Sequence, residues 1–219
     1  MHHIVWDWNG TLFDDLHIVV DAVNTSLAVF GEGPIDAATY RDHYVRPVPL
    51  FYESLLGRNI DEAMWRTIDE EFHLAYHTSL DRAELAPDAM RAVDAVARAG
   101  GTQSILSMWW HNQLVPVVQA FGLDERMIAV DGHRGAPGET KVQHLAHHVE
   151  QLHLLHPRLI EASLVAIGDI TDDAVAAAAV GVDCVLYDSG SQPRSLLEGE
   201  KVPVADSLLE AVWLAGVRG

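Results

Sequence analysis

The sequence predicts an α/β protein, in which a mainly parallel sheet carries helices on both faces and an all-helical segment is inserted near the N-terminus. Three observations predict this class: short apolar, β-branched runs recur along the chain, helical patterns lie between them, and one long segment holds helical patterns alone. The apolar runs are HIVWD at 3–7, TQSILS at 102–107, MIAVDG at 127–132, SLVAIGD at 163–169 and VDCVLYD at 182–188. Strands that alternate with helices pair in parallel, and such sheets bind ligands at the carboxyl ends of their strands.

Amphipathic helices are predicted between the later runs. The segment DAMRAVDAVARAGG from Asp88 places small and β-branched residues on one face and ends in two glycines. The segment TKVQHLAHHVEQLHLLHP has a similar apolar stripe and ends at a proline. This second segment carries His144, His147 and His148, and its i, i+4 pair has the spacing of a transition-metal site. No third ligand is evident, so we interpret these histidines as a solvated face.

The stretch from 16 to 84 breaks the alternation, because it holds several helical patterns and no clear apolar run of the buried-strand kind. Glycines and prolines separate these patterns, and aromatic residues recur at helical spacing, as they do in the core of a helical domain. We therefore predict a core formed by residues 1–15 and 85–219, and an all-helical cap formed by residues 16–84.

Composition and charge exclude several classes of partner. The chain has 219 residues, 49% of them hydrophobic, which is enough for a substantial core. Its formal net charge of -18 opposes binding to nucleic acid phosphates and to anionic membrane surfaces. No basic leader or membrane-length apolar span is present, and Cys184, the single cysteine, lies in an apolar run where we expect it to be buried. We expect a cytoplasmic protein without nucleic acid or membrane partners.

Four polar features fall at or just beyond the ends of predicted elements, at the edge of the sheet where ligands bind. Asp7 ends the first apolar run, Ser107 ends the second, Lys141 lies ahead of a helix, and the acidic segment GDITDD at 168–173 follows the fourth. An acid at the end of a strand is often a helix cap or a turn former, so each feature alone is a weak signal. Their order and spacing carry the information.

In this order the features resemble the haloacid dehalogenase superfamily of hydrolases. That family has a D-x-D-G-T loop after its first strand, a Ser or Thr after its second, a Lys before a later helix and a G-D-x-x-x-D pair after its fourth. Here the first loop reads Asp7-Trp8-Asn9-Gly10-Thr11. The resemblance covers nearly the whole chain, and the helical insert directly after the first motif is similar to the branch with a helical cap, which includes phosphoglycolate phosphatase-like enzymes. It implies a Rossmann-like core, a phosphatase-type hydrolase and Mg²⁺ as the cofactor.

The residue types fit phosphoryl transfer. An aspartate carboxylate can take the phosphoryl group as an aspartyl-phosphate and so divide hydrolysis into two steps, a role that the resemblance implies for Asp7. Ser107 would donate to a phosphate oxygen, and Lys141 would neutralise charge on Asp7 and on the phosphoryl group. Gly10 permits a turn whose backbone amides point at an anion, and Thr11 can offer its hydroxyl or amide there. These five residues form the predicted phosphate-binding set.

Magnesium suits such a site because it prefers oxygen ligands, among them carboxylates, a backbone carbonyl, phosphate and water. The resemblance implies that Asp7 and Asp169 are side-chain ligands, and that the residue at position 9 contributes its backbone carbonyl, which Asn9 retains. The family spacing points to Asp173, rather than to its neighbour Asp172, as the acid that supports the metal-bound waters.

Asn9 departs from the family pattern, in which a second aspartate protonates the leaving oxygen and then activates water. A side-chain amide does not exchange a proton near neutral pH, and general acid-base catalysis contributes about 10²- to 10⁴-fold in rate. We expect the smallest loss for leaving groups that need no proton, such as those of acyl phosphates or activated aryl esters. Binding of metal and phosphate is expected to survive.

Two functions of different classes follow. One is a slow or substrate-restricted phosphatase, in which water, His111 or His43 covers the proton transfer; the other is a non-hydrolytic protein that binds or senses a phosphorylated ligand. The ligand expected in either case is a small phosphorylated metabolite, and the cap residues predicted to contact it are Arg41, Tyr44 and Arg46.

Two further activities of the superfamily are disfavoured. Carbon-halogen hydrolases need no metal, yet the Gly168-Asp169 acid and the Gly10-Thr11 turn are both present. Phosphonate hydrolases of the family use a cap lysine as a Schiff base, and no lysine lies between 1 and 140.

Overall fold

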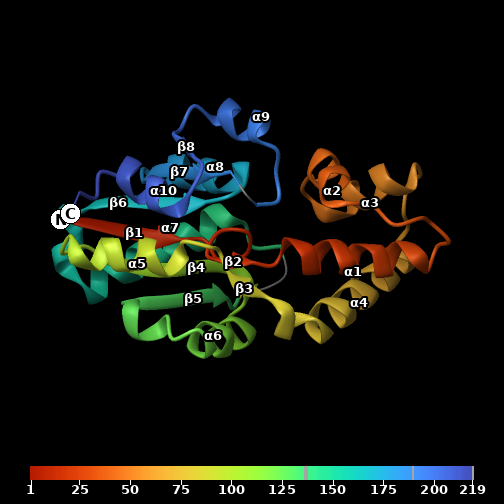
Figure 1. The fold of residues 1–219 in the computed structure, drawn as a ribbon, viewed down its shortest axis with the longest axis horizontal. Helices are drawn as coiled ribbons and strands as arrows, with labels where there is room; N and C mark the ends of the chain where they lie inside the picture. Colours follow the sequence, from red (N-terminus) through yellow and green to blue (C-terminus); the bar gives the residue numbers. More distant parts are fainter. Residues whose placement is uncertain (136–137, 189, 219) are drawn as a thin grey trace.

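The computed structural model describes residues 1–135, 138–188 and 190–218. Within these residues the main sheet has six parallel strands in the order β5-β4-β1-β6-β7-β8 (Figure 1). The strands are β1 (His2–Trp6), β4 (Thr102–Trp110), β5 (Ala129–His133), β6 (Ser163–Gly168), β7 (Asp183–Tyr187) and β8 (Val204–Ala205). β1 lies between β4 and β6, so the residues that follow these three strands meet at one edge of the sheet.

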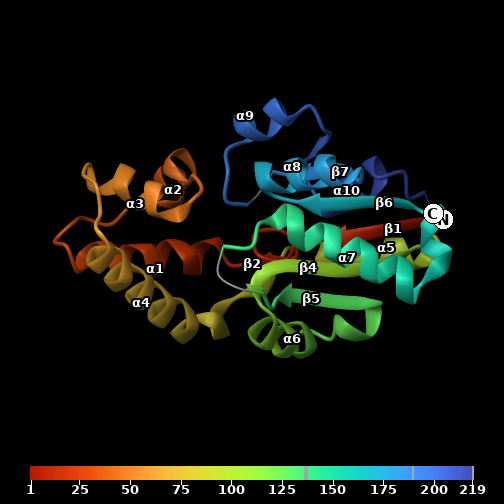
Figure 2. The same ribbon diagram turned by 180° about the vertical axis from the view of Figure 1, so that it is seen from behind.

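Helices cover both faces of this sheet, and the side chains of each strand alternate between the two faces. Ile4 and Trp6 of β1 pack on one face against α5 (Ala89–Arg98), α6 (His111–Ala120) and α10 (Leu208–Leu214). Val5 packs on the other face against α7 (Lys141–Leu155) and α8 (Thr171–Val180), which Figure 2 shows from behind. A short helix, α9 (Arg194–Leu197), follows β7. The predicted α/β class is confirmed.

Four helices form a cap beyond the carboxyl ends of the strands (Figures 1 and 2). They are α1 (Leu16–Ala28), α2 (Ala37–His43), α3 (Val48–Leu56) and α4 (Glu62–Thr78). α1 and α4 run side by side, and the cap has its own apolar cluster, which includes Val23, Phe51 and Ile68. The predicted inserted helical cap is therefore present, while the domain boundaries at 15/16 and 84/85 stay a prediction.

A two-stranded antiparallel ribbon stands at the base of the cap. β2 (Phe13–Asp14) pairs with β3 (Glu84–Leu85), so the chain enters and leaves the cap through adjacent strands. Phe13 is fully buried. The sequence analysis missed this ribbon because each strand has only two residues, too few for an alternating pattern.

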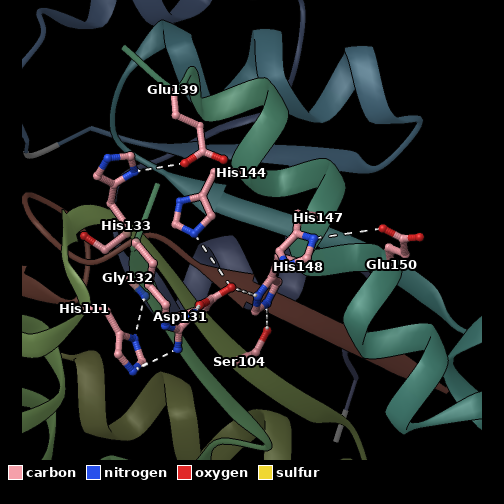
Figure 3. Close-up of polar contacts among 12 residues, drawn as sticks. Ser104, His111, Asp131, Gly132, His133, Glu139, His144, His147, His148 and Glu150 are labelled. Carbon is pink, nitrogen blue, oxygen red and sulfur yellow. Dashed lines mark hydrogen bonds and ion pairs between the residues drawn. The ribbon is translucent and has the colours of Figure 1, made fainter. Parts of the chain in front are cut away.

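The interpretation of the α7 histidines as a solvated face is wrong for two of the three. His147 is exposed, but His144 and His148 are 4% and 2% exposed and point toward the buried carboxylate of Asp131 in β5 (Figure 3). His148 Nδ1 lies 3.3 Å from Asp131 Oδ2, and its Nε2 lies 2.8 Å from the hydroxyl of Ser104 in β4. These histidines face the sheet because the strands offer polar partners inside an otherwise apolar layer.

Two expectations drawn from composition concern burial and membranes. Cys184 is buried in β7, as predicted. In the part of the chain that the structure describes, no helix has the length and apolar character needed to cross a membrane.

Candidate active site

The predicted site residues meet beneath the cap, at the carboxyl ends of β1, β4 and β6. Asp7 follows β1, Ser107 lies in β4, Asp169 follows β6 and Lys141 is the first residue of α7. All four line one cavity of about 370 Å³, whose upper wall comes from the cap helices. Asn9 lines it as well.

Lys141 joins two of the carboxylates. Its Nζ donates to Asp7 Oδ1 at 2.5 Å and also forms an ion pair with Asp173. Thr140 begins α7 with a capping box, in which its hydroxyl accepts from the backbone of Gln143, and this cap orients the first turn that carries Lys141. Asp173 Oδ2 accepts from the backbone of Ile170 at 3.1 Å, so Asp173 is fixed on both sides.

Asp7 and Asp169 flank the same hydroxyl. Thr11 Oγ1 lies 3.5 Å from Asp7 Oδ2 and 3.3 Å from Asp169 Oδ1. Asp169 Oδ2 accepts from the backbone of Ser191 at 2.8 Å. Gly10 has a φ of +76°, and a side chain there would strike the Asp169 carboxylate, so only glycine suits the turn.

Burial and like charge shape the ionisation of this cluster. Burial raises the pKa of Asp7 to about 7, although Lys141 opposes the shift. Burial and the neighbouring charge of Asp7 also raise the pKa of Asp169. Burial alone would lower the pKa of Lys141, but Asp173 and Asp7 outweigh it and raise the pKa, so Lys141 stays a cation. The cluster therefore holds three carboxylates and one ammonium group, which contacts Asp7 and Asp173.

This excess of buried negative charge fits a divalent cation that prefers oxygen ligands. Among the described residues no three Asp, Glu, His or Cys side chains form a complete metal cage. Magnesium does not need one, because it commonly binds one or two carboxylates and fills its other positions with waters and substrate phosphate. Asp7, Asp169 and the backbone carbonyl of Asn9 are thus a fitting donor set.

Ser107 lies where the pairing of β4 with β5 becomes irregular, between Ser107 and Trp110. Its Oγ accepts from the backbone N–H of Trp109 at 3.1 Å. This bond leaves the hydroxyl hydrogen of Ser107 to donate, and the side chain lines the cavity.

The side chain of Asn9 is held by two residues that the sequence analysis missed. Its Nδ2 donates to Asp15 Oδ2 at 2.7 Å and to the hydroxyl of Tyr76 at 2.9 Å, and that hydroxyl donates to the same Asp15 oxygen at 2.6 Å. Gly10 N also donates to Asp15, at 3.2 Å. Asp15 occupies the N-cap position of α1, yet its side chain makes no capping bond. We call Asn9, Asp15 and Tyr76 the amide triad.

Two of the three cap residues predicted to contact the ligand line the cavity, and the third does not. Tyr44 and Arg46 line the cavity, and Arg46 Nε lies 3.5 Å from Asp172 Oδ2. Arg41 is not among the lining residues; its Nε donates to the backbone carbonyl of Gly190 at 2.9 Å.

The two histidines proposed for proton transfer lie outside the cavity lining. His43 Nδ1 lies 2.6 Å from Ser54 Oγ within the cap. His111 is bound to the backbone of Gly132 and to Arg134 (Figure 3 shows the Gly132 contact). Neither placement supports a role for these side chains in proton transfer.

A parallel sheet with its acids at the strand ends, an inserted helical cap and a lysine bound to the first acid define a capped α/β protein with an acidic site at the edge of the sheet. The chain matches the family described as haloacid dehalogenase-like hydrolase over residues 1–181, and it belongs to this family. No curated protein matches it.

Solved structures agree on the fold. A predicted phosphoglycolate phosphatase from Haemophilus somnus has a TM-score of 0.75 at 15% identity, with 98% of this chain and 97% of that chain covered. A haloacid dehalogenase-like hydrolase from Streptococcus pneumoniae has a TM-score of 0.79 at 17% identity, with 97% of each chain covered. Protein Tyrosine Kinase A from Mycobacterium tuberculosis has a TM-score of 0.78 at 21% identity, with 99% and 98% covered. At these identities the likeness shows the fold, which different activities can share.

Proposed function

We propose that the chain is a Mg²⁺-dependent phosphatase, phosphoglycolate phosphatase-like in class, which hydrolyses a small phosphorylated metabolite through an aspartyl-phosphate on Asp7. The observation that carries the proposal is the position of Asp7, whose carboxylate lines the cavity beneath the cap while Lys141 binds it from the start of α7. Family membership supports hydrolysis, and the phosphatase names among the similar structures support a phosphate ester.

Each residue of the site has a part in this reaction. An Asp7 oxygen attacks phosphorus in line with the leaving oxygen, and Lys141 and Ser107 bind the phosphoryl oxygens. Gly10 and Thr11 shape the turn around the transferred group. Magnesium, when bound, neutralises the charge of the phosphoryl group. Asp7, Asp169 and the Asn9 carbonyl would hold it, and Asp173 would support its waters.

Turnover is expected to be slow or limited to certain leaving groups, because the Asn9 amide cannot give or take the proton that the reaction moves. The cap covers the cavity, so its closure would exclude water during the first transfer and its opening would release the product. Substrate choice is assigned to the cap side chains that line the cavity, Tyr44 and Arg46 among them.

A second candidate is a non-hydrolytic protein that binds a phosphorylated ligand. The amide triad favours it, because both hydrogens of the Asn9 amide are engaged by neighbours and none is left for a leaving group. Both candidates use the same cavity and the same phosphate ligands. They differ in whether the bound phosphate ester is hydrolysed.

The decisive experiment is a screen of phosphorylated metabolites with Mg²⁺ on the wild-type protein, Asp7→Asn and the control Asp14→Asn, which alters an exposed acid of β2. We expect phosphate release and a phosphorylated protein, detected by intact mass, for the wild type and the control but not for Asp7→Asn. Activity that persists in Asp7→Asn would exclude Asp7 as the nucleophile. Ligand binding without any phosphate release would favour the second candidate.

A further inference from the structure

The cavity above Asp7 has walls that are mainly apolar and aromatic. Of the 24 described residues that line it, eight are Phe, Tyr or Trp. Trp65, Phe72 and Tyr76 come from α4 and Phe51 from α3, and Trp109 faces them from the core. The rings of Phe72 and Tyr76 are stacked with centroids 5.8 Å apart, and Trp109 meets Tyr76 edge to face at 6.0 Å. Such walls favour a ligand with an apolar body.

The charged groups of the cavity do not favour an anionic leaving group. Lys141 and Arg46 are the only Lys or Arg side chains among the described lining residues. Lys141 is engaged by Asp7 and Asp173, and Arg46 faces Asp172. The cap wall itself contributes an acid, Asp69, and Asp15 adds another at the base of the cap. A second carboxylate or phosphate on the substrate would meet these acids.

Asn9 restricts the leaving group for a chemical reason that does not depend on the walls or charges of the cavity. Without a proton donor at this position, the leaving oxygen departs with its negative charge, so its basicity controls the first step. A phenolate is the anion of an acid whose pKa is about 10, as in tyrosine. An alkoxide is far more basic, because its conjugate acid, an alcohol, gives up a proton about as reluctantly as water does. Aryl esters therefore suit an amide at position 9 and alkyl esters do not.

We propose that the site takes aryl phosphate monoesters, with the phosphoryl group at Asp7 and the aromatic ring in the apolar cavity beneath α3 and α4. This inference rests on the proposed phosphatase function and names its substrate class. An Asp7 oxygen forms a bond to phosphorus while the bond from phosphorus to the aryl oxygen breaks, and the electron pair leaves on the phenolate, which takes a proton from solvent. Water then attacks the aspartyl-phosphate, its proton passes to solvent, and inorganic phosphate and the Asp7 carboxylate result.

A matched substrate series tests the two halves of the proposal. Phenyl phosphate and cyclohexyl phosphate have similar size and apolarity but differ in leaving-group basicity, whereas acetyl phosphate leaves easily but has no ring. With Mg²⁺ we expect kcat/KM, which reports the step that releases the leaving group, to be at least about 100-fold higher for phenyl phosphate than for cyclohexyl phosphate, since no acid catalyst compensates. We expect KM for acetyl phosphate to be roughly tenfold higher than for phenyl phosphate, because it leaves the apolar walls unfilled.

The variant Trp65→Ala tests whether the aromatic wall of the cavity binds the substrate ring. Trp213→Ala is the matched control, since Trp213 lies exposed on α10 outside the cavity. Trp65→Ala is expected to raise KM for phenyl phosphate roughly tenfold more than KM for acetyl phosphate, and the control to change neither. If circular dichroism shows that Trp65→Ala does not fold, Val19→Ser, which alters the α1 wall, is measured instead.

Binding separates this inference from the proposed function. Phenylphosphonate is not hydrolysed, so calorimetry on the wild type reports the aryl preference even if the protein releases no phosphate. We expect phenylphosphonate to bind at least about tenfold more tightly than methylphosphonate. Equal binding of the two, or 2-phosphoglycolate turned over faster than phenyl phosphate, would overturn the aryl inference and leave the phosphatase intact. Aryl-selective binding without release of phosphate from any ester or from acetyl phosphate would instead reject the phosphatase.

Discussion

Asn9 has partners that make an amide suitable at its position. A carboxylate there would face Asp15 Oδ2 at about the distance that the amide nitrogen now holds, 2.7 Å, in a pocket where Asp15 is 2% exposed. Two carboxylates this close cannot both ionise, so they would share a proton. An amide and a carboxylate instead form a hydrogen bond. The departure from the family motif is therefore coupled to Asp15, a residue outside the motif.

We accordingly predict that Asn9→Asp alone destabilises the protein, although it restores the family motif. It is expected to lower the free energy of unfolding by about 1 to 3 kcal/mol near pH 8, because the amide donor is replaced by a second carboxylate that must take up a proton to stay beside Asp15. The exchange Asn9→Asp/Asp15→Asn keeps one amide and one carboxylate in contact. It is expected to recover most of that stability and to raise kcat for alkyl phosphates by about 10²-fold or more.

Denaturant unfolding and alkyl phosphate turnover, measured on both variants and on Asp15→Asn, check this prediction. If the single Asn9→Asp variant is as stable and as active as the exchange, Asp15 has no influence on position 9. The exchange also bears on the second candidate function, because a silent wild type with an active exchange variant would mark a phosphate-binding protein.

At the scale of elements, the amide triad connects the cap to the catalytic loop. Tyr76 lies in the last turn of α4 and donates to Asp15, which immediately precedes α1, while it accepts from Asn9. The β2–β3 ribbon holds the two chain crossings at the same place. A shift of α4 would therefore act, through these hydrogen bonds, on the loop that carries Asp7.

Tyr76→Phe removes the hydroxyl and keeps the ring, so it tests this connection. We expect a loss of about 1 kcal/mol in the free energy of unfolding, as for one buried hydrogen bond. We also expect a change in kcat larger than the change in KM, because the loop would be less well positioned. Thr78→Val removes an exposed hydroxyl of the same helix that donates to Leu74 O, away from the cavity lining among the described residues, so this control should leave the kinetics unchanged. Kinetics of Tyr76→Phe that match the control would refute the connection.

The sequence could predict the elements that carry strong periodic patterns and the residues that follow them. The parallel sheet, the helical cap and the family were all predicted and are confirmed, while the roles of Asp7, Ser107, Lys141 and Asp169 stay predictions. The contact of Tyr76 with Asp15 joins residues 61 positions apart, and no local pattern marks it. The burial of His144 and His148 was misread for the same reason, since these residues lie on α7 and their partners lie on β4 and β5.

At the scale of the whole molecule, buried histidines make stability depend on pH. His3 of β1 is fully buried, with its ring nitrogens 2.8 Å from Thr102 Oγ1 and 2.9 Å from Ser104 Oγ. Ser104 Oγ continues to His148 Nε2, and His148 Nδ1 to Asp131. A polar network therefore crosses the sheet from β1 to β5 beneath α7. Its two histidines, Ser104 and Asp131 are buried in the folded state and exposed in the unfolded chain.

His3 gives this network a defined pH dependence. Burial, followed by the charges of neighbouring histidines, lowers the pKa of His3 from 6.5 to about 3. Between these two values the unfolded chain binds a proton that the folded chain does not, so stability is full above pH 6.5 and falls as the pH decreases. Burial alone would raise the pKa of Asp131, but contacts with His144 and His148 outweigh it and lower the pKa, so Asp131 adds a further loss below about pH 4.

We therefore predict that His3→Gln, which keeps hydrogen-bonding capacity without titrating, flattens the pH dependence of unfolding. The parent protein is expected to lose up to about 3 kcal/mol more than the variant between pH 7 and pH 4, from the His3 shift alone. Denaturant unfolding at several pH values measures it. Comparison with the parent cancels the opposite contributions of the active-site aspartates, whose pKa values are raised. His17→Gln, at an exposed position of α1, is the control and is expected to keep the parent's pH dependence. Parallel pH curves for His3→Gln and the parent would mean that His3 does not link folding to protons.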